Sequence, residues 1–157
     1  MTEPITFTLH IDPHGKEAAK SRRGMPGVYT PDATKKRMKE IATLARPFKP
    51  AEKLEGPLRV ELHAEFHRPD YMSKRSKRTG EMLGGYDEGP VWMTAKPDVD
   101  NISKLVLDSL KEFWGDDAQV VSEEVTKVYH AMGGKPSVRV TIRGAGEEMV
   151  AQTRGRG

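Results

Sequence analysis

Alternating hydrophobic and polar residues predict the β-strands of this chain. Residues 5–11 (ITFTLHI), 58–67 (LRVELHAEFH) and 137–143 (SVRVTIR) each place every second side chain on one apolar face. A period of two is the pattern of a strand that buries one face and exposes the other. A further strand is expected at residues 123–130, followed by the turn sequence Gly133-Gly134-Lys135-Pro136.

Two segments show the three- and four-residue spacing of amphipathic helices. The first is predicted to have Thr30 as its N-cap and Pro31 at its first position, and to end near Arg46. The second is predicted to begin at Asp100 or Asn101. Its apolar face is formed by Ile102, Leu105, Val106, Leu110 and Phe113.

Two further segments lack periodicity. Residues 15–27 are polar, basic and interrupted by glycine and proline, which predicts a loop. Residues 68–95 form a second, unusually long loop that carries the basic run SKRSKR. The order strand, helix, strand, long loop, helix, strand, strand predicts an α/β chain of the α+β type, with one small mixed β-sheet and packed helices.

Length and composition favour a single domain. A chain of 157 residues is long enough for one core but short for two. We assign the domain to residues 1–146 and a loose tail to residues 147–157. No apolar run has membrane-spanning length and no leader is evident, so we expect a cytoplasmic location without membrane contact. The absence of cysteine excludes disulfides, zinc–thiolate sites and cysteine nucleophiles.

The net charge of +3 conceals a segregation of charge along the chain. Residues 16–49 contain ten bases and three acids, a balance of +7, whereas residues 98–124 contain two bases and eight acids, a balance of −6. Two differently solvated faces would explain this pattern. So would a metal-dependent enzyme that acts on a polyanion, because bases attract phosphates and carboxylates hold cations.

The acidic segment KPDVDNISKLVLDSLKEFWGDDAQVV has features that capping and ion pairing do not explain. A helix cap at Asp100 and an exposed ladder of Asp100, Lys104 and Asp108 would be ordinary. Asp98 close to Asp100 on extended chain, and a second pair at Asp116 and Asp117, are harder to explain without a cation. Carboxylate oxygens suit a hard cation such as Mg²⁺. Lys104 would then neutralise charge on a phosphoryl group in the transition state.

This segment, KPDVDNISKLVLDSL followed by DDAQVV, resembles the central signature of the RusA-type Holliday junction resolvases, small metal-dependent endodeoxyribonucleases. Weaker similarity occurs in VYTPDAT, GPLRVELHAEFHRP and PSVRVTIR, so that the resemblance covers roughly residues 4–143. The sequence LKEFWG replaces the Asn-Gly-like turn of many members.

The resemblance implies catalytic metal-binding carboxylates at Asp98, Asp100 and Asp117, a catalytic lysine at Lys104 and a RusA-like fold. Asp116 would support the metal site or cap the turn. The implied cofactor is Mg²⁺, with Mn²⁺ as a substitute, and the implied partner is four-way junction DNA, bound by a homodimer that nicks two strands symmetrically. Such a protein would be associated with the nucleoid.

Basic residues are expected to bind the phosphates of the DNA. They are Arg22 and Arg23 in the first loop, Lys35 and Lys36 on the first helix, and Lys74, Arg75, Lys77 and Arg78 in the long loop. Phe113 and Trp114 are expected in the core, although a wedge between bases is an alternative. Two other functions stay open: a non-catalytic architectural DNA-binding protein, and a metal-dependent nuclease or phosphohydrolase without junction specificity.

Overall fold

The computed structural model of the protein describes residues 3–13, 20–21, 28–29 and 31–146. Within these residues the chain forms helices α1 (Asp32–Ala45) and α2 (Val99–Ser109). The main sheet consists of β1 (Ile5–Leu9), β4 (Leu58–Phe66), β5 (Val91–Trp92), β6 (Val120–Tyr129) and β7 (Ser137–Gly144), and β2 (Lys20–Ser21) pairs separately with β3 (Val28–Tyr29). Short 3-10 turns are η1 (Arg46–Phe48), η2 (Asp70–Ser73), η3 (Leu83–Gly85) and η4 (Asp117–Gln119). None of the described helices is long and apolar enough to cross a membrane.

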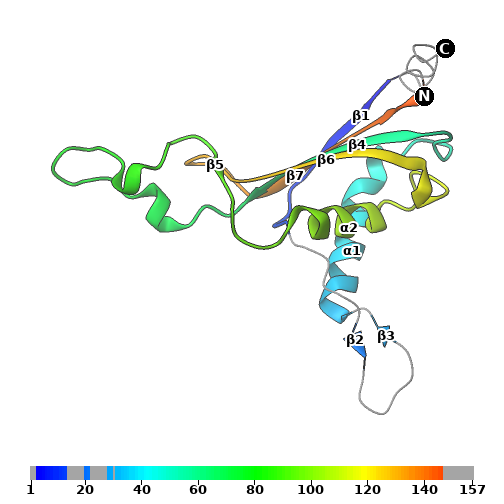
Figure 1. Ribbon diagram of the computed structural model, residues 1–157, viewed down its shortest axis with the longest axis horizontal. Coiled ribbons are helices and arrows are strands. Elements are labelled where there is room, and N and C mark those ends of the chain that lie inside the picture. The colour runs from blue at the N-terminus through cyan, green and yellow to red at the C-terminus, as the bar shows by residue number, and fades with distance from the viewer. Residues whose placement is uncertain (1–2, 14–19, 22–27, 30, 147–157) are drawn as a thin grey trace, which may run out of the picture.

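Strand β4 lies at the centre of the main sheet, whose order is β1-β7-β4-β6-β5 (Figure 1). It pairs antiparallel with β7 and parallel with β6. The outer pairs, β1 with β7 and β5 with β6, are antiparallel. A parallel neighbour requires a crossover connection, and between β4 and β6 this connection contains the predicted long loop and α2. The predicted α+β fold with a mixed sheet and packed helices is confirmed.

The core lies between the helices and one face of the sheet. Every second residue of β4 from Leu58 to Phe66 is buried, as the alternation predicts. The intervening residues Glu61, His63 and Glu65 stay partly exposed on the other face. Helix α2 contributes Ile102, Leu105 and Val106, each at most 1% exposed, and burial of one such side chain contributes about 1.5–3 kcal/mol. Figure 1 shows α1 and α2 on the same side of the sheet.

Helix α1 begins one residue later than predicted. Pro31 is its N-cap and makes no side-chain cap hydrogen bond, and the predicted cap, Thr30, lies outside the described residues. Pro31 has φ −55° and ψ 144°, which is extended backbone, so the helix starts at Asp32. The exposed face with Lys35 and Lys36 is as predicted.

One strand begins earlier than predicted, and strands form in two segments that were predicted as loops. Strand β6 begins at Val120 rather than at residue 123, because its parallel pairing with β4 already starts opposite Leu58. Strand β5 forms inside the predicted long loop through pairing with the end of β6. The pair β2–β3 likewise forms where a loop was predicted. Such pairings depend on a distant or facing partner, which the local hydrophobic pattern does not reveal.

Residues 69–90, called the arm below, extend away from the sheet between β4 and β5 (Figure 1). Its base is held by Arg68, which is 3% exposed. The Arg68 guanidinium donates to the carbonyls of Met72, Asp87, Gly89 and His130 and to Ser73 Oγ, at 2.5–3.4 Å. These acceptors lie on both legs of the arm and just beyond β6. One buried side chain therefore fixes where the arm leaves the sheet.

Candidate functional site

The N-terminus of α2 presents Asp98 to solvent. Asp98 is the N-cap residue, with extended backbone, yet its side chain makes no capping hydrogen bond. Its carboxylate is 56% exposed and lies 3.7 Å from the Nζ of Lys96. A carboxylate at a helix N-terminus ordinarily accepts from the backbone amides of the first turn. This one does not, so the exposed carboxylate is not occupied by the helix cap and is accessible to a cation.

Asp100 and Lys104 lie on the exposed side of α2. Their side chains are each 63% exposed and form an i, i+4 pair with 3.8 Å between the carboxylate oxygen and Nζ. The ion pair was predicted, but the expectation that Asp98 and Asp100 share one extended segment is wrong. Asp100 belongs to the first turn of α2, because the helix begins at Val99. Asp98 therefore precedes the helix and Asp100 lies inside it, so the two are not alternate residues of one extended strand.

The predicted second aspartate pair lies in the turn before β6. Trp114 is 2% exposed, and its indole Nε1 donates to Asp117 Oδ1 over 3.4 Å. Asp116 has a different contact, since its Oδ1 accepts from the amide of Ala118 at 2.9 Å. Gln119 completes this turn by accepting, through Oε1, from the amides of Gly115 and Asp116. Asp116 thus caps the turn, one of the two roles considered for it.

The burial of Phe113 and Trp114, each 2% exposed, confirms the core interpretation. Phe113 stacks on Phe7 of β1 with ring centroids 5.6 Å apart. Neither ring has the exposure that a wedge between bases requires. Trp114 instead connects the core to Asp117.

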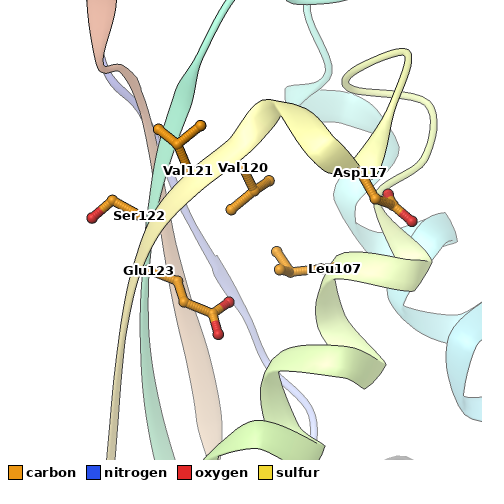
Figure 2. A pocket seen from close by; sticks show the side chains of 6 residues that line it. All are labelled: Leu107, Asp117, Val120, Val121, Ser122 and Glu123. Carbon is orange, nitrogen blue, oxygen red and sulfur yellow. The ribbon is translucent and has the colours of Figure 1, made fainter. Parts of the chain in front are cut away.

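A pocket of about 360 Å³ separates the start of β6 from α2. Asp117 lies at one end, and Leu107, Val120 and Glu123 point into the gap (Figure 2). Glu123 Oε2 accepts from Ser103 Oγ at 2.6 Å, which links the strand to the helix. Because Asp100, Ser103 and Leu107 are spaced i, i+3 and i+7, they share one side of α2. The helix face that bears Asp100 therefore continues along the pocket towards Asp117.

Lys127 fixes the segment that leads into α2. Its Nζ donates to the carbonyls of Ala95 and Pro97 at 2.6 and 2.8 Å. Its own carbonyl accepts from the amide of Met93 at 3.4 Å. The residues immediately before Asp98 are thus tied to β6.

The sequence interpretation missed Glu123 and Lys127. Both belong to β6, and both face the α2 side, since Val125, between them, is paired with the buried Leu62 of β4. A charged residue at a core-facing strand position is the signal that could have revealed them. It was hidden because residues 123–130 carry apolar side chains on both faces, Val125 on one and Val128 on the other, so the pattern does not show which face is covered by the helix.

The described residues do not gather three or more histidine, aspartate or glutamate side chains into one metal-binding group. Of the carboxylates predicted as ligands, Asp98 and Asp100 lie at the start of α2, whereas Asp117 lines the pocket beside Leu107, near the other end of that helix. Their chemistry fits a hard cation, and Mg²⁺ in proteins is commonly held by one or two carboxylates, with water and substrate phosphate as its other ligands.

The arm carries exposed bases. Lys74, Lys77 and Arg78 are exposed, whereas Arg75 pairs with Glu88. Tyr71, in the arm, and Trp92, beside it, are 54% and 73% exposed. Tyr71 contacts Tyr86 edge-on, and both lie near Tyr129, whose pKa is raised by burial and by the charge of these neighbours when ionised. The predicted DNA contacts Arg22 and Arg23 lie outside the described residues.

Two comparisons relate the chain to known proteins. The sequence profile of the family described as Endodeoxyribonuclease RusA matches residues 10–143. A protein of Bacillus subtilis (strain 168), named "Uncharacterized protein YqaN", is 30% identical over 142 residues, which cover 88% of this chain and 95% of that protein. The family match spans β4, the arm, α2 and β6, and it therefore includes Asp98, Asp100 and Asp117.

Proposed function

Because the chain belongs to the RusA endodeoxyribonuclease family, we propose that it is a Mg²⁺-dependent endonuclease that resolves four-way DNA junctions by paired, symmetric nicks. The observation that carries the proposal is the N-terminus of α2. There Asp98 keeps its carboxylate out of the helix cap, next to the exposed Asp100 and Lys104. A helix that needed only capping would use the Asp98 side chain.

The residues proposed to hold the cation are Asp98, Asp100 and Asp117. Nucleases of this family are metal-dependent, and carboxylate oxygens are the ligands that Mg²⁺ prefers. The chemistry that Mg²⁺ supplies when bound is a more acidic water and a polarised phosphoryl oxygen. Mn²⁺, which accepts the same oxygen ligands, would substitute for it.

Lys104 and the turn around Asp117 have separate tasks in this proposal. Lys104 lies one helical turn beyond Asp100, so its ammonium is able to offset negative charge that grows on the phosphate during cleavage. The Trp114 indole orients Asp117 from the core. Asp116 holds the turn, so that the next carboxylate has a defined position.

DNA binding is proposed to depend on phosphate contacts rather than on base reading. Lys35 and Lys36 on α1 and the exposed bases of the arm supply positive charge, and Tyr71 and Trp92 offer flat apolar faces. We further propose a homodimer, because two equivalent nicks in a junction with two-fold symmetry require two related sites.

The decisive experiment uses a synthetic four-way junction, labelled in turn on each strand, and a linear duplex as control. In Mg²⁺ we expect paired symmetric nicks on the junction alone, and in EDTA none. Binding without nicks would show an architectural protein instead. Equal cutting of the linear duplex would leave a nuclease without junction specificity.

A further inference from the structure

Lys127 lies at a strand position on the helix-covered face of the sheet, where a charged side chain is unusual. On β6 it pairs laterally with Ala64 of β4, which is fully buried on the helix-covered face of the sheet. An ammonium on this face loses part of its hydration, and that loss must be offset by hydrogen bonds. The carbonyls of Ala95 and Pro97 supply them at 2.6 and 2.8 Å.

These two carbonyls belong to the segment that delivers Asp98. Strand β5 ends at Trp92 and α2 begins at Val99, so residues 93–98 belong to neither element. Lys127 holds this segment at three points, through its own carbonyl and the two bonds of its Nζ. The last of them, at Pro97, is adjacent to Asp98.

The other lysines near the site make different contacts. Lys96 is 87% exposed and Lys104 is 63% exposed, and each lies 3.7–3.8 Å from a carboxylate. Lys127 instead binds backbone. It therefore acts on the position of the chain rather than on the charge of one aspartate.

We propose that Lys127 is a positioning residue of the nuclease site. It holds residues 95–97 against β6 and so sets the position of the Asp98 carboxylate. This inference rests on the proposed function. It predicts that removal of the ammonium weakens cation binding and lowers turnover. The affinity for DNA should not change, because the bases of the arm that are proposed to bind phosphate remain in place.

The test compares Lys127→Met, Lys127→Arg and, as a matched control, Lys135→Met, which removes an exposed lysine from the turn between β6 and β7. Single-turnover junction cleavage is measured across a Mg²⁺ titration, junction affinity in EDTA, and the melting temperature for folding. For Lys127→Met we expect a rate roughly 10- to 100-fold lower, as for other residues that orient metal ligands, and a higher Mg²⁺ midpoint. Junction affinity should stay within about two-fold, since phosphate contacts dominate it.

The arginine variant separates positioning from a structural role, because a guanidinium also donates to two carbonyls. Lys127→Arg should recover most of the rate and the Mg²⁺ midpoint. A Lys127→Met protein with the rate and midpoint of the Lys135→Met control would overturn the inference. If the methionine variant does not fold, Lys127→Arg decides alone, and a wild-type Mg²⁺ midpoint would support the inference whereas loss of cleavage in a folded protein would overturn it.

A cation probe gives a readout that does not require cleavage. The Trp114 indole donates to Asp117, so Tb³⁺ bound at these carboxylates should be sensitised by excitation of tryptophan. We expect Lys127→Met to need several-fold more Tb³⁺ than wild type, and equal titrations would count against the inference. Failure of wild-type protein to cut junctions would overturn the proposed function separately.

Discussion

Asp116 and Asp117 are adjacent in sequence, yet their side chains have different surroundings. The Asp116 side chain accepts from a backbone amide inside the turn, whereas the Asp117 side chain lines the pocket and accepts from a core indole. The turn that Asp116 closes starts from Trp114, whose indole fixes Asp117. Of these two neighbours, Asp116 therefore has a structural role in the turn, whereas the Asp117 carboxylate lies where it could bind a cation.

Asp98→Asn, Asp100→Asn and Asp117→Asn are each expected to lower junction cleavage in Mg²⁺ by roughly 100-fold or more, the scale of losing a group that stabilises the transition state. Junction binding should be retained or tightened, because each change removes a negative charge near phosphate. Cleavage assays and gel-shift titrations on the same preparations provide the measurement. A variant that cleaves at the wild-type rate would remove its residue from the site.

Asp116 is expected to respond differently. Asparagine is as good a helix cap as aspartate, so Asp116→Asn should keep both stability and cleavage within a few-fold. Asp116→Ala should lower the free energy of unfolding by about 1 kcal/mol through loss of the cap. Denaturant unfolding and cleavage of the two variants check this. Loss of cleavage in a stable Asp116→Asn protein would return Asp116 to the metal ligands.

At the residue scale, the sequence predicted those features that depend on the spacing of apolar residues along the chain. The buried face of α2 follows from periodicity, because helix geometry converts spacing into a face. Leu110 and Phe113, which were predicted on that face, are buried but lie beyond the end of the helix at Ser109. Arg68 and Lys127 were not predicted in their roles. Their acceptors lie up to 62 and 32 positions away in the chain, and backbone carbonyls leave no signature in a sequence.

At the scale of elements, the arm shows how a long segment without periodicity acquires a defined shape. Its core is small, with Met72 as its buried hydrophobic residue. Order comes instead from Arg68, from the ion pair between Arg75 and Glu88, and from backbone bonds such as Leu83 amide to Lys74 carbonyl. The sequence predicted a long loop at residues 68–95 but neither strand β5 within it nor the conformation of the arm, because the hydrogen bonds of the arm connect residues without a repeating interval.

Arg68→Met is expected to loosen the arm. Each buried carbonyl left without a donor costs about 1–3 kcal/mol, and the loss should appear as faster hydrogen exchange and proteolysis within residues 69–90. Lys77→Met is the matched control, since it removes an exposed base from the same arm. Equal protection of the arm in both variants would show that Arg68 does not organise it.

At the scale of the whole molecule, charge and fold agree. The acidic balance counted for residues 98–124 corresponds to the carboxylates of α2 and of the turn before β6, and groups of exposed bases lie on α1 and the arm. A polyanion attracted by the bases would meet the carboxylates only where a cation reduces their repulsion.

Replacement of Lys74, Lys77 and Arg78 together by glutamine is expected to weaken junction binding. The slope of log affinity against log salt should become shallower by about 1 for each lost phosphate contact, up to about 3. The single-turnover rate at saturating protein should change little, because the carboxylates are intact. The control is the replacement of three exposed lysines outside the arm by glutamine, which changes the net charge by the same amount. They are Lys53, Lys111 and Lys135. Identical salt slopes for the two triple variants would exclude arm contacts with phosphate.

The pairing of β1 with β7 has a consequence for the order in which the protein folds. The two strands are joined across some 135 positions of the chain, as between Thr6 and Thr141. At a synthesis rate of 5–20 residues per second, β1 waits roughly 7 to 27 seconds for its partner. During that time Phe7 lacks its neighbours on β7, while its ring contact with Phe48 and later that with Phe113 can form. The sheet is therefore completed after translation of β7, and its first strand is the part of the nascent chain most in need of protection.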